Sequence, residues 1–103
     1  MMRIERWNEK TDGKFSESAM QKKLERLGYS VSRYVYSAGT YFPDHTHDVD
    51  KIDGVVSGEF KMTTPEGEVV LKAGDMLFVP RGTVHSAEAI SRQAVVSLDA
   101  VKW

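Results

Sequence analysis

The sequence of 103 residues contains no cysteine, and this absence limits the chemistry of the chain before any motif is considered. Disulfides, thiolate nucleophiles and thiolate metal sites are excluded, so a bound metal would need nitrogen and oxygen ligands. Histidine is also scarce, with three residues in the chain. Any histidine site must therefore be built from this small set.

Long apolar runs and a strong net charge are missing as well. The apolar runs fall far short of the roughly 20 residues that a membrane helix needs, and the N-terminal segment MMRIERWNEK lacks the apolar core of a signal peptide. The formal net charge of −1 gives no electrostatic basis for binding nucleic acid or an anionic membrane surface. We therefore expect a cytoplasmic protein that binds neither.

What remains is typical of one globular domain, with 41% hydrophobic and 28% charged residues. Residues 16–27 show a helical pattern, in which serines precede apolar residues at spacings of three and four, and Gly28 follows as a stop signal. After Gly28, short strand-like runs alternate with turn residues. We predict an arm with one short helix over residues 1–28 and an all-β barrel over residues 29–103.

The segment PDHTHDVDKIDG holds two histidines one residue apart, His45 and His47. On a strand such residues face the same side, and Lys51 and Asp53 share that side if the strand continues. His85 follows a strand and a Pro-Arg-Gly turn, which would bring a third imidazole back across a barrel. Three convergent imidazoles suit a divalent transition metal.

The glycines and prolines around these histidines form a pattern that resembles the cupin superfamily. The first cupin motif, G-x5-H-x-H-x3,4-E-x6-G, corresponds here to Gly39, His45, His47, Lys51 in the glutamate place, and Gly58. The second motif, G-x5-P-x-G-x2-H-x3-N, corresponds to Gly74, Pro80, Gly82, His85, and Ala89 in the asparagine place. Together the two motifs span residues 39–89, about half of the chain.

This resemblance implies a cupin jelly-roll barrel of two antiparallel sheets with the histidines in its mouth. It also implies a metal, commonly iron, nickel, zinc, manganese or copper, held by His45, His47, His85 and a glutamate that this chain replaces by lysine. Small cupins commonly pair, so we expect a homodimer, with Trp7 in the arm packed against the barrel or a second subunit. The resemblance does not fix a reaction, because cupins include oxygenases, isomerases, decarboxylases and sugar-binding proteins.

Lys51 is the feature that opposes a metal at this site. An ammonium about 5 Å from a divalent ion, at an effective dielectric of about 20, repels it by about 7 kcal/mol. Three arrangements would relieve this repulsion: an ion pair with Asp48, Asp50 or Asp53, loss of the lysine proton, or a site that binds an anionic ligand without metal. For Asp53, which is predicted to face inward, we expect a role in the pocket.

Three functions follow from these residues. The first is a metal-dependent enzyme, such as a dioxygenase, that acts on a small acidic substrate, with Lys51 and Asp53 as the catalytic candidates beside the metal. The second is a metal-free or metal-poor cupin that binds a small acidic or sugar-like ligand without catalysis. The third is a metal-free isomerase with a histidine as general base. In each case the expected partner is a small molecule.

Overall fold

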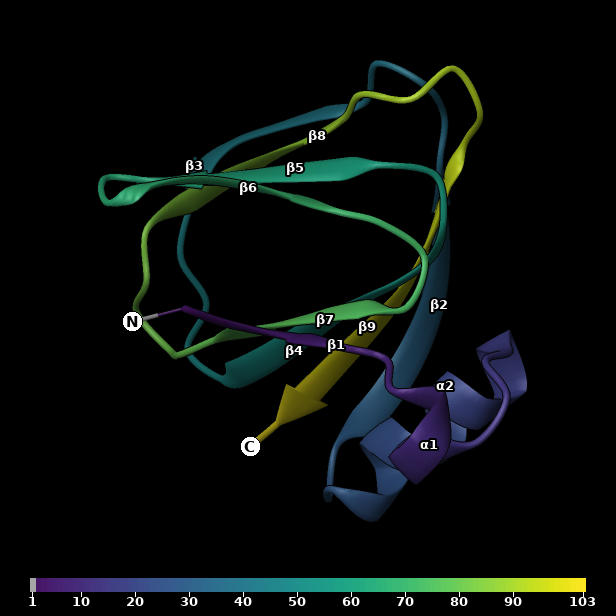
Figure 1. Cartoon of the computed structure of the whole chain (residues 1–103). Coiled ribbons are helices and arrows are strands. Elements are labelled where there is room, and N and C mark those ends of the chain that lie inside the picture. The colour runs from purple at the N-terminus through teal and green to yellow at the C-terminus, as the bar shows by residue number, and fades with distance from the viewer. Residues whose placement is uncertain (1) are drawn as a thin grey trace.

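The computed structural model describes residues 2–103, which form two antiparallel sheets that face each other, with two short helices at one end (Figure 1). The order of elements along the chain is β1 (Arg3–Arg6), α1 (Glu9–Asp12), α2 (Glu17–Arg26), β2 (Ser30–Tyr36), β3 (Tyr41–His45), β4 (Asp50–Ser57), β5 (Phe60–Thr64), β6 (Gly67–Leu71), β7 (Asp75–Val79), β8 (His85–Ala89) and β9 (Val95–Lys102).

The larger sheet has the strand order β1-β7-β4-β9-β2, and the smaller sheet has the order β3-β8-β5-β6. From β2 to β9 the chain passes back and forth between the sheets, with β5 and β6 as a hairpin within the small sheet, so it wraps around a common interior, as Figure 1 shows. This arrangement confirms the predicted all-β jelly roll of two antiparallel sheets with a short N-terminal helix. No helix within residues 2–103 is long and apolar enough to cross a membrane.

Strand β4 is buried on both faces, and its side chains pack alternately into two separate hydrophobic clusters. Val55 belongs to the cluster between the sheets, whereas Ile52 belongs to a second cluster beneath α2. Because successive side chains on a strand point to opposite faces, Lys51 and Asp53 share the inner face with Val55. The register of this one strand therefore places two charged residues inside the barrel.

Helix α2 covers the outer face of the large sheet. Ser16 caps the helix, since its side chain accepts a hydrogen bond of 3.0 Å from the backbone N–H of Ala19. Met20 and Leu24, one turn apart, are fully buried against the sheet. The helix approaches β4 closely at Gly54, where a Cβ would lie 2.7 Å from the sulfur of Met20.

The first residues of the arm form a strand that the sequence pattern did not indicate. Strand β1 pairs with β7, with Ile4 opposite Leu77. The following Trp7 donates its backbone N–H to the carbonyl of Gly74 at 2.9 Å and packs edge-to-face on Phe15. The arm thus packs on the barrel of its own chain, where Trp7 contacts the core cluster beneath α2.

Candidate metal centre

The three histidines come from two neighbouring strands of the small sheet and the loop beside them. His45 is the last residue of β3 and His85 is the first residue of β8, and the two are register partners across this strand pair. His47 lies two residues beyond the end of β3, so it is on a loop and not on the strand that its spacing suggested. The backbone N–H of Gly82 donates to the carbonyl of His47 at 2.9 Å and ties this loop to the one before β8.

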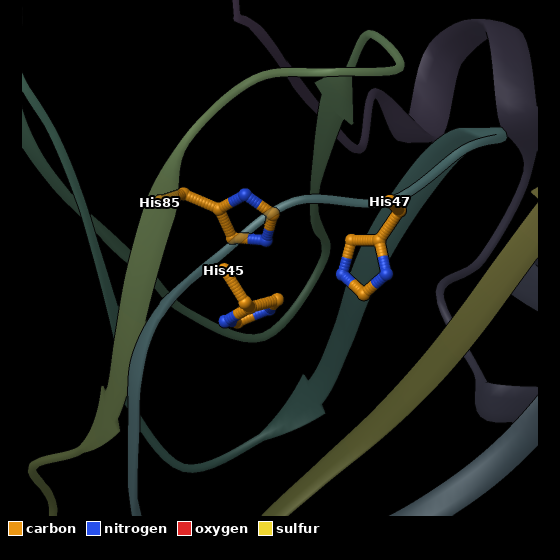
Figure 2. Close-up of side chains that lie close together, drawn as sticks. All are labelled: His45, His47 and His85. Atoms are coloured by element: carbon orange, nitrogen blue, oxygen red, sulfur yellow. The ribbon is translucent and has the colours of Figure 1, made fainter.

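The imidazoles converge, as Figure 2 shows. One ring nitrogen from each of His45, His47 and His85 lies within 4.8 Å of the others. The ring centroids are 4.3 Å apart for His45 and His85, 4.8 Å for His45 and His47, and 5.2 Å for His47 and His85. The structure therefore brings together all three histidines that the sequence predicted for the site.

Backbone carbonyls hold two of the rings in one tautomer. Nδ1 of His45 lies 2.7 Å from the carbonyl oxygen of Pro43, and Nδ1 of His85 lies 2.9 Å from that of Thr83. A carbonyl oxygen only accepts, so each Nδ1 carries the proton and donates it. This leaves the Nε2 lone pair of both rings free for a ligand bond, the arrangement that metal-binding histidines use.

His47 supplies an unpartnered nitrogen. Its Nε2 atom is buried and has no hydrogen-bond partner among the described residues. Burial, together with the charge of Lys51 and the neighbouring rings of His45 and His85, lowers the pKa of His47 to about 4. The imidazole is therefore neutral at physiological pH and ready to donate a lone pair.

Lys51 stands behind the histidines in a buried ion cluster. Its Nζ atom lies 2.8 Å from Oδ1 of Asp99 and 3.6 Å from Oδ1 of Asp53. Burial alone would lower the pKa of Lys51, but the charges of Asp53 and Asp99 outweigh this effect and raise the pKa above its usual value. The lysine is therefore a paired ammonium, which is the first of the three arrangements that would relieve repulsion of a metal.

The partners of Lys51 differ in part from the candidates in the sequence. Asp53 is one of them, and burial raises the pKa of this carboxyl against the opposing charge of Lys51. Asp50 instead accepts a hydrogen bond of 3.1 Å from the backbone N–H of Arg81. Asp99 lies outside both cupin motifs, and its position on β9, opposite Asp53, depends on a long-range strand pairing that no local pattern indicated.

A cavity of about 140 Å³ opens in front of the histidines. Its polar wall consists of the histidines and the ion cluster: His45, His47, His85, Lys51, Asp53 and Asp99. Its apolar wall consists of Tyr36, Phe42, Phe60, Met62 and Ala87. A space of this size suits a ligand of a few carbon atoms with a polar end directed at the histidines.

Residues 32–101 match the cupin domain family. The chain belongs to the cupins. Among curated proteins, none matches the sequence at significant similarity.

Solved structures of other small cupins show the same fold. A conserved protein of unknown function from Streptococcus pyogenes is 19% identical, with a TM-score of 0.63 over 71% of this chain and 62% of its own. An RmlC-like cupin from Shewanella frigidimarina is 26% identical, with a TM-score of 0.61 over 71% and 64%. A DUF861 family protein from Thermotoga maritima, 16% identical, matches 99% of this chain and 100% of its own with a TM-score of 0.63. The chain thus spans less than two thirds of the Streptococcus and Shewanella proteins.

This cupin departs from the family's motifs at two positions. At the glutamate position stands Lys51, whose side chain is buried in the ion cluster. At the asparagine position stands Ala89, which is 1% exposed and belongs to the core between the sheets. The first departure changes the charge of the site, whereas the second changes only its packing.

Proposed function

We propose that this cupin binds a divalent transition metal through His45, His47 and His85 and acts there as a metal-dependent enzyme on a small acidic substrate. The observation that carries the proposal is the state of the three rings. Two are fixed by backbone carbonyls with Nε2 free, and the third presents a buried Nε2 without a partner. A structural histidine would instead use its nitrogens in hydrogen bonds within the protein.

The donor set fits such an ion. Three neutral imidazoles suit zinc, copper, iron and nickel, and the two carboxylates behind them offset the positive charge of Lys51. An ion held by three ligands would supply Lewis acidity and open coordination positions for substrate or dioxygen. The protein contributes the rest: it orients the rings, encloses the ligand in the cavity, and places aromatic and apolar side chains around the ligand's carbon atoms.

Lys51 and Asp53 belong to this function as charged groups of the cavity wall. The paired ammonium of Lys51 is a poor nucleophile, because amine attack requires the neutral form. Its short contact with Asp99 leaves it less available to a substrate carboxylate than a free lysine would be. The position of the cluster supports an electrostatic role for both residues.

The test is elemental analysis of protein purified without an affinity tag or added metal, followed by titration with zinc. We expect close to one ion per chain in the wild-type protein and none in His47→Ala. Thr46→Ala, which changes an exposed neighbour, serves as the control and should retain the ion. A wild-type protein that takes up no metal even from excess zinc would leave the two metal-free functions, ligand binding and isomerisation, which turnover of a ligand found by screening would separate.

A further inference from the structure

The ion cluster of Lys51, Asp53 and Asp99 contains two carboxylates and one ammonium. All three side chains line the histidine cavity, and no other lysine, arginine, aspartate or glutamate of the described chain lines it. Lys51 and Asp53 are buried, and the side chain of Asp99 is 21% exposed. With both carboxylates ionised, the cluster carries one net negative charge.

The backbone forces this cluster together. Asp53 on β4 and Asp99 on β9 are directly opposite each other in an antiparallel pair, and like charges in that position repel. Lys51 lies two residues before Asp53 on the same face, so its ammonium reaches both carboxylates. Ions are costly to bury, and a cluster with an unmatched charge lacks internal compensation. The excess negative charge is therefore relieved by a nearby cation or, because burial raises the pKa of Asp53, by a proton on that carboxyl.

We propose that this cluster gives the metal site, through space, the single negative charge that a glutamate ligand gives in other cupins. The inference rests on the proposed function, since it assumes that the histidines hold a divalent ion. Lys51 then serves as a positioning residue that holds two carboxylates in place of one. Asp99 is the most exposed member of the cluster, with a side chain that is 21% exposed against 9% for Lys51 and 8% for Asp53.

The net charge of the metal-loaded cavity also indicates which class of ligand it should bind. A divalent ion, three neutral imidazoles and the cluster together carry a charge of +1. One bound monoanion, such as a small monocarboxylate, neutralises the cavity, whereas a dianion leaves an uncompensated negative charge in an enclosed space. The site should therefore favour a monocarboxylic over a dicarboxylic acid of the same size.

The zinc affinity of variants with different cluster charges tests whether the cluster supplies a negative charge to the metal site. Lys51→Met removes the ammonium, Asp99→Asn removes one carboxylate at constant shape, and the double variant restores the net charge of −1. We expect Lys51→Met to tighten zinc about tenfold, Asp99→Asn to weaken it about tenfold, and the double variant to lie within about threefold of wild type. Asp44→Asn, the same change at an exposed position, should alter affinity less than about twofold.

The direction of the change in zinc affinity distinguishes an electrostatic role of the cluster from a purely structural one. If the cluster merely supported the fold, both single variants would weaken zinc binding, and that result would overturn the inference. Circular dichroism establishes that each variant is folded. Should Lys51→Met fail to fold, the comparison of Asp99→Asn with Asp44→Asn still decides, because equal zinc affinities in these two also overturn it.

Ligand binding to the zinc-loaded protein tests whether the cluster makes the cavity sensitive to the charge of the ligand. Oxamate and oxalate have the same shape and carry one and two negative charges. Removing the charge of Asp99 should help both, and because Coulomb energy scales with ligand charge, the fold gain for oxalate should be about the square of the gain for oxamate. Calorimetry on wild type and Asp99→Asn measures both gains, and equal or absent gains would refute the assignment of Asp99 to the ligand space.

The failures are distinguishable. A wild-type protein that takes up no zinc contradicts the proposed function, and the inference falls with it. In the other case, zinc uptake is lost in His47→Ala, but the zinc affinities of the Lys51 and Asp99 variants do not change in the expected directions. This result leaves the proposed function intact and removes only the role assigned to the cluster.

Discussion

Lys51 Nζ lies 2.8 Å from Oδ1 of Asp99, a residue 48 positions further along the chain and on the neighbouring strand of the same sheet. This contact changes the electrostatic effect that a lysine at the glutamate position of a cupin has on a metal ion. Considered alone, the lysine repels a cation. Considered with Asp99 and Asp53, it is one ammonium between two carboxylates, and the net charge that we propose for this group would attract a metal.

Lys51→Glu should tighten metal binding and weaken the metal-free fold. The substitution places a third carboxylate next to Asp53 and Asp99, which raises the attraction for a cation and the repulsion within the empty site. We expect at least a tenfold gain in zinc affinity, by the same estimate for charges near an ion. Thermal unfolding with and without zinc should show a lower melting temperature without the ion and a larger increase with it. Unchanged metal content in this variant would mean that Lys51 does not act on the ion.

The stability of the metal-free protein should fall as the pH drops from about 6.5 to about 4. In this range an unfolded histidine binds a proton, whereas folded His47 does not until its lowered pKa of about 4. The unfolded state thus binds more protons, and stability decreases with decreasing pH. His47 is partly exposed, so we expect its contribution to be only about 1 kcal/mol. Urea unfolding at pH 7 and pH 4.5 should show a smaller difference for His47→Gln than for wild type, and an equal difference would contradict the assignment.

Gly54→Ala should destabilise the protein by about 1–3 kcal/mol, the usual cost of overpacking a core. The added Cβ would lie 2.7 Å from the sulfur of Met20, where α2 rests on β4. Met20→Ala should itself cost about 2–5 kcal/mol through the cavity it leaves. Because the added methyl group would occupy part of that cavity, the double variant should lose less than the sum of the two. Strict additivity in denaturant unfolding would show that the two positions do not compete for space.

We predict a homodimer that forms through the exposed edge of the large sheet and not through the N-terminal arm. Strand β2 is the last strand of the large sheet and pairs only with β9 within the described chain. It presents Tyr34 and Val35, and β3 presents Tyr41 beyond it, all about half exposed. Light scattering at micromolar concentration should give a dimer mass, and Val35→Lys should reduce it to the monomer mass. A monomer in the wild-type protein would end this prediction.

The cupin fold and the three histidines were predictable from sequence because each depends on local spacing. Glycine and proline fix turns, and the turns fix where His45, His47 and His85 emerge. The loop position of His47 was missed, since a strand and a short extended loop share the same residue pattern. Asp99 was missed for a different reason: its relation to Lys51 exists only once β4 and β9 pair, and pairing is a property of the whole sheet.

Strand β1 and helix α2 have a consequence for how this protein can be shortened. The family match covers residues 32–101, yet β1 protects the edge of β7, and α2 buries Met20 and Leu24 against the outer face of the large sheet. A chain trimmed to the matched range would expose an unpaired strand edge and an apolar surface, both of which favour aggregation. The smallest unit that keeps the histidines in place is therefore longer than the family's own span, and it includes the first residues of the arm.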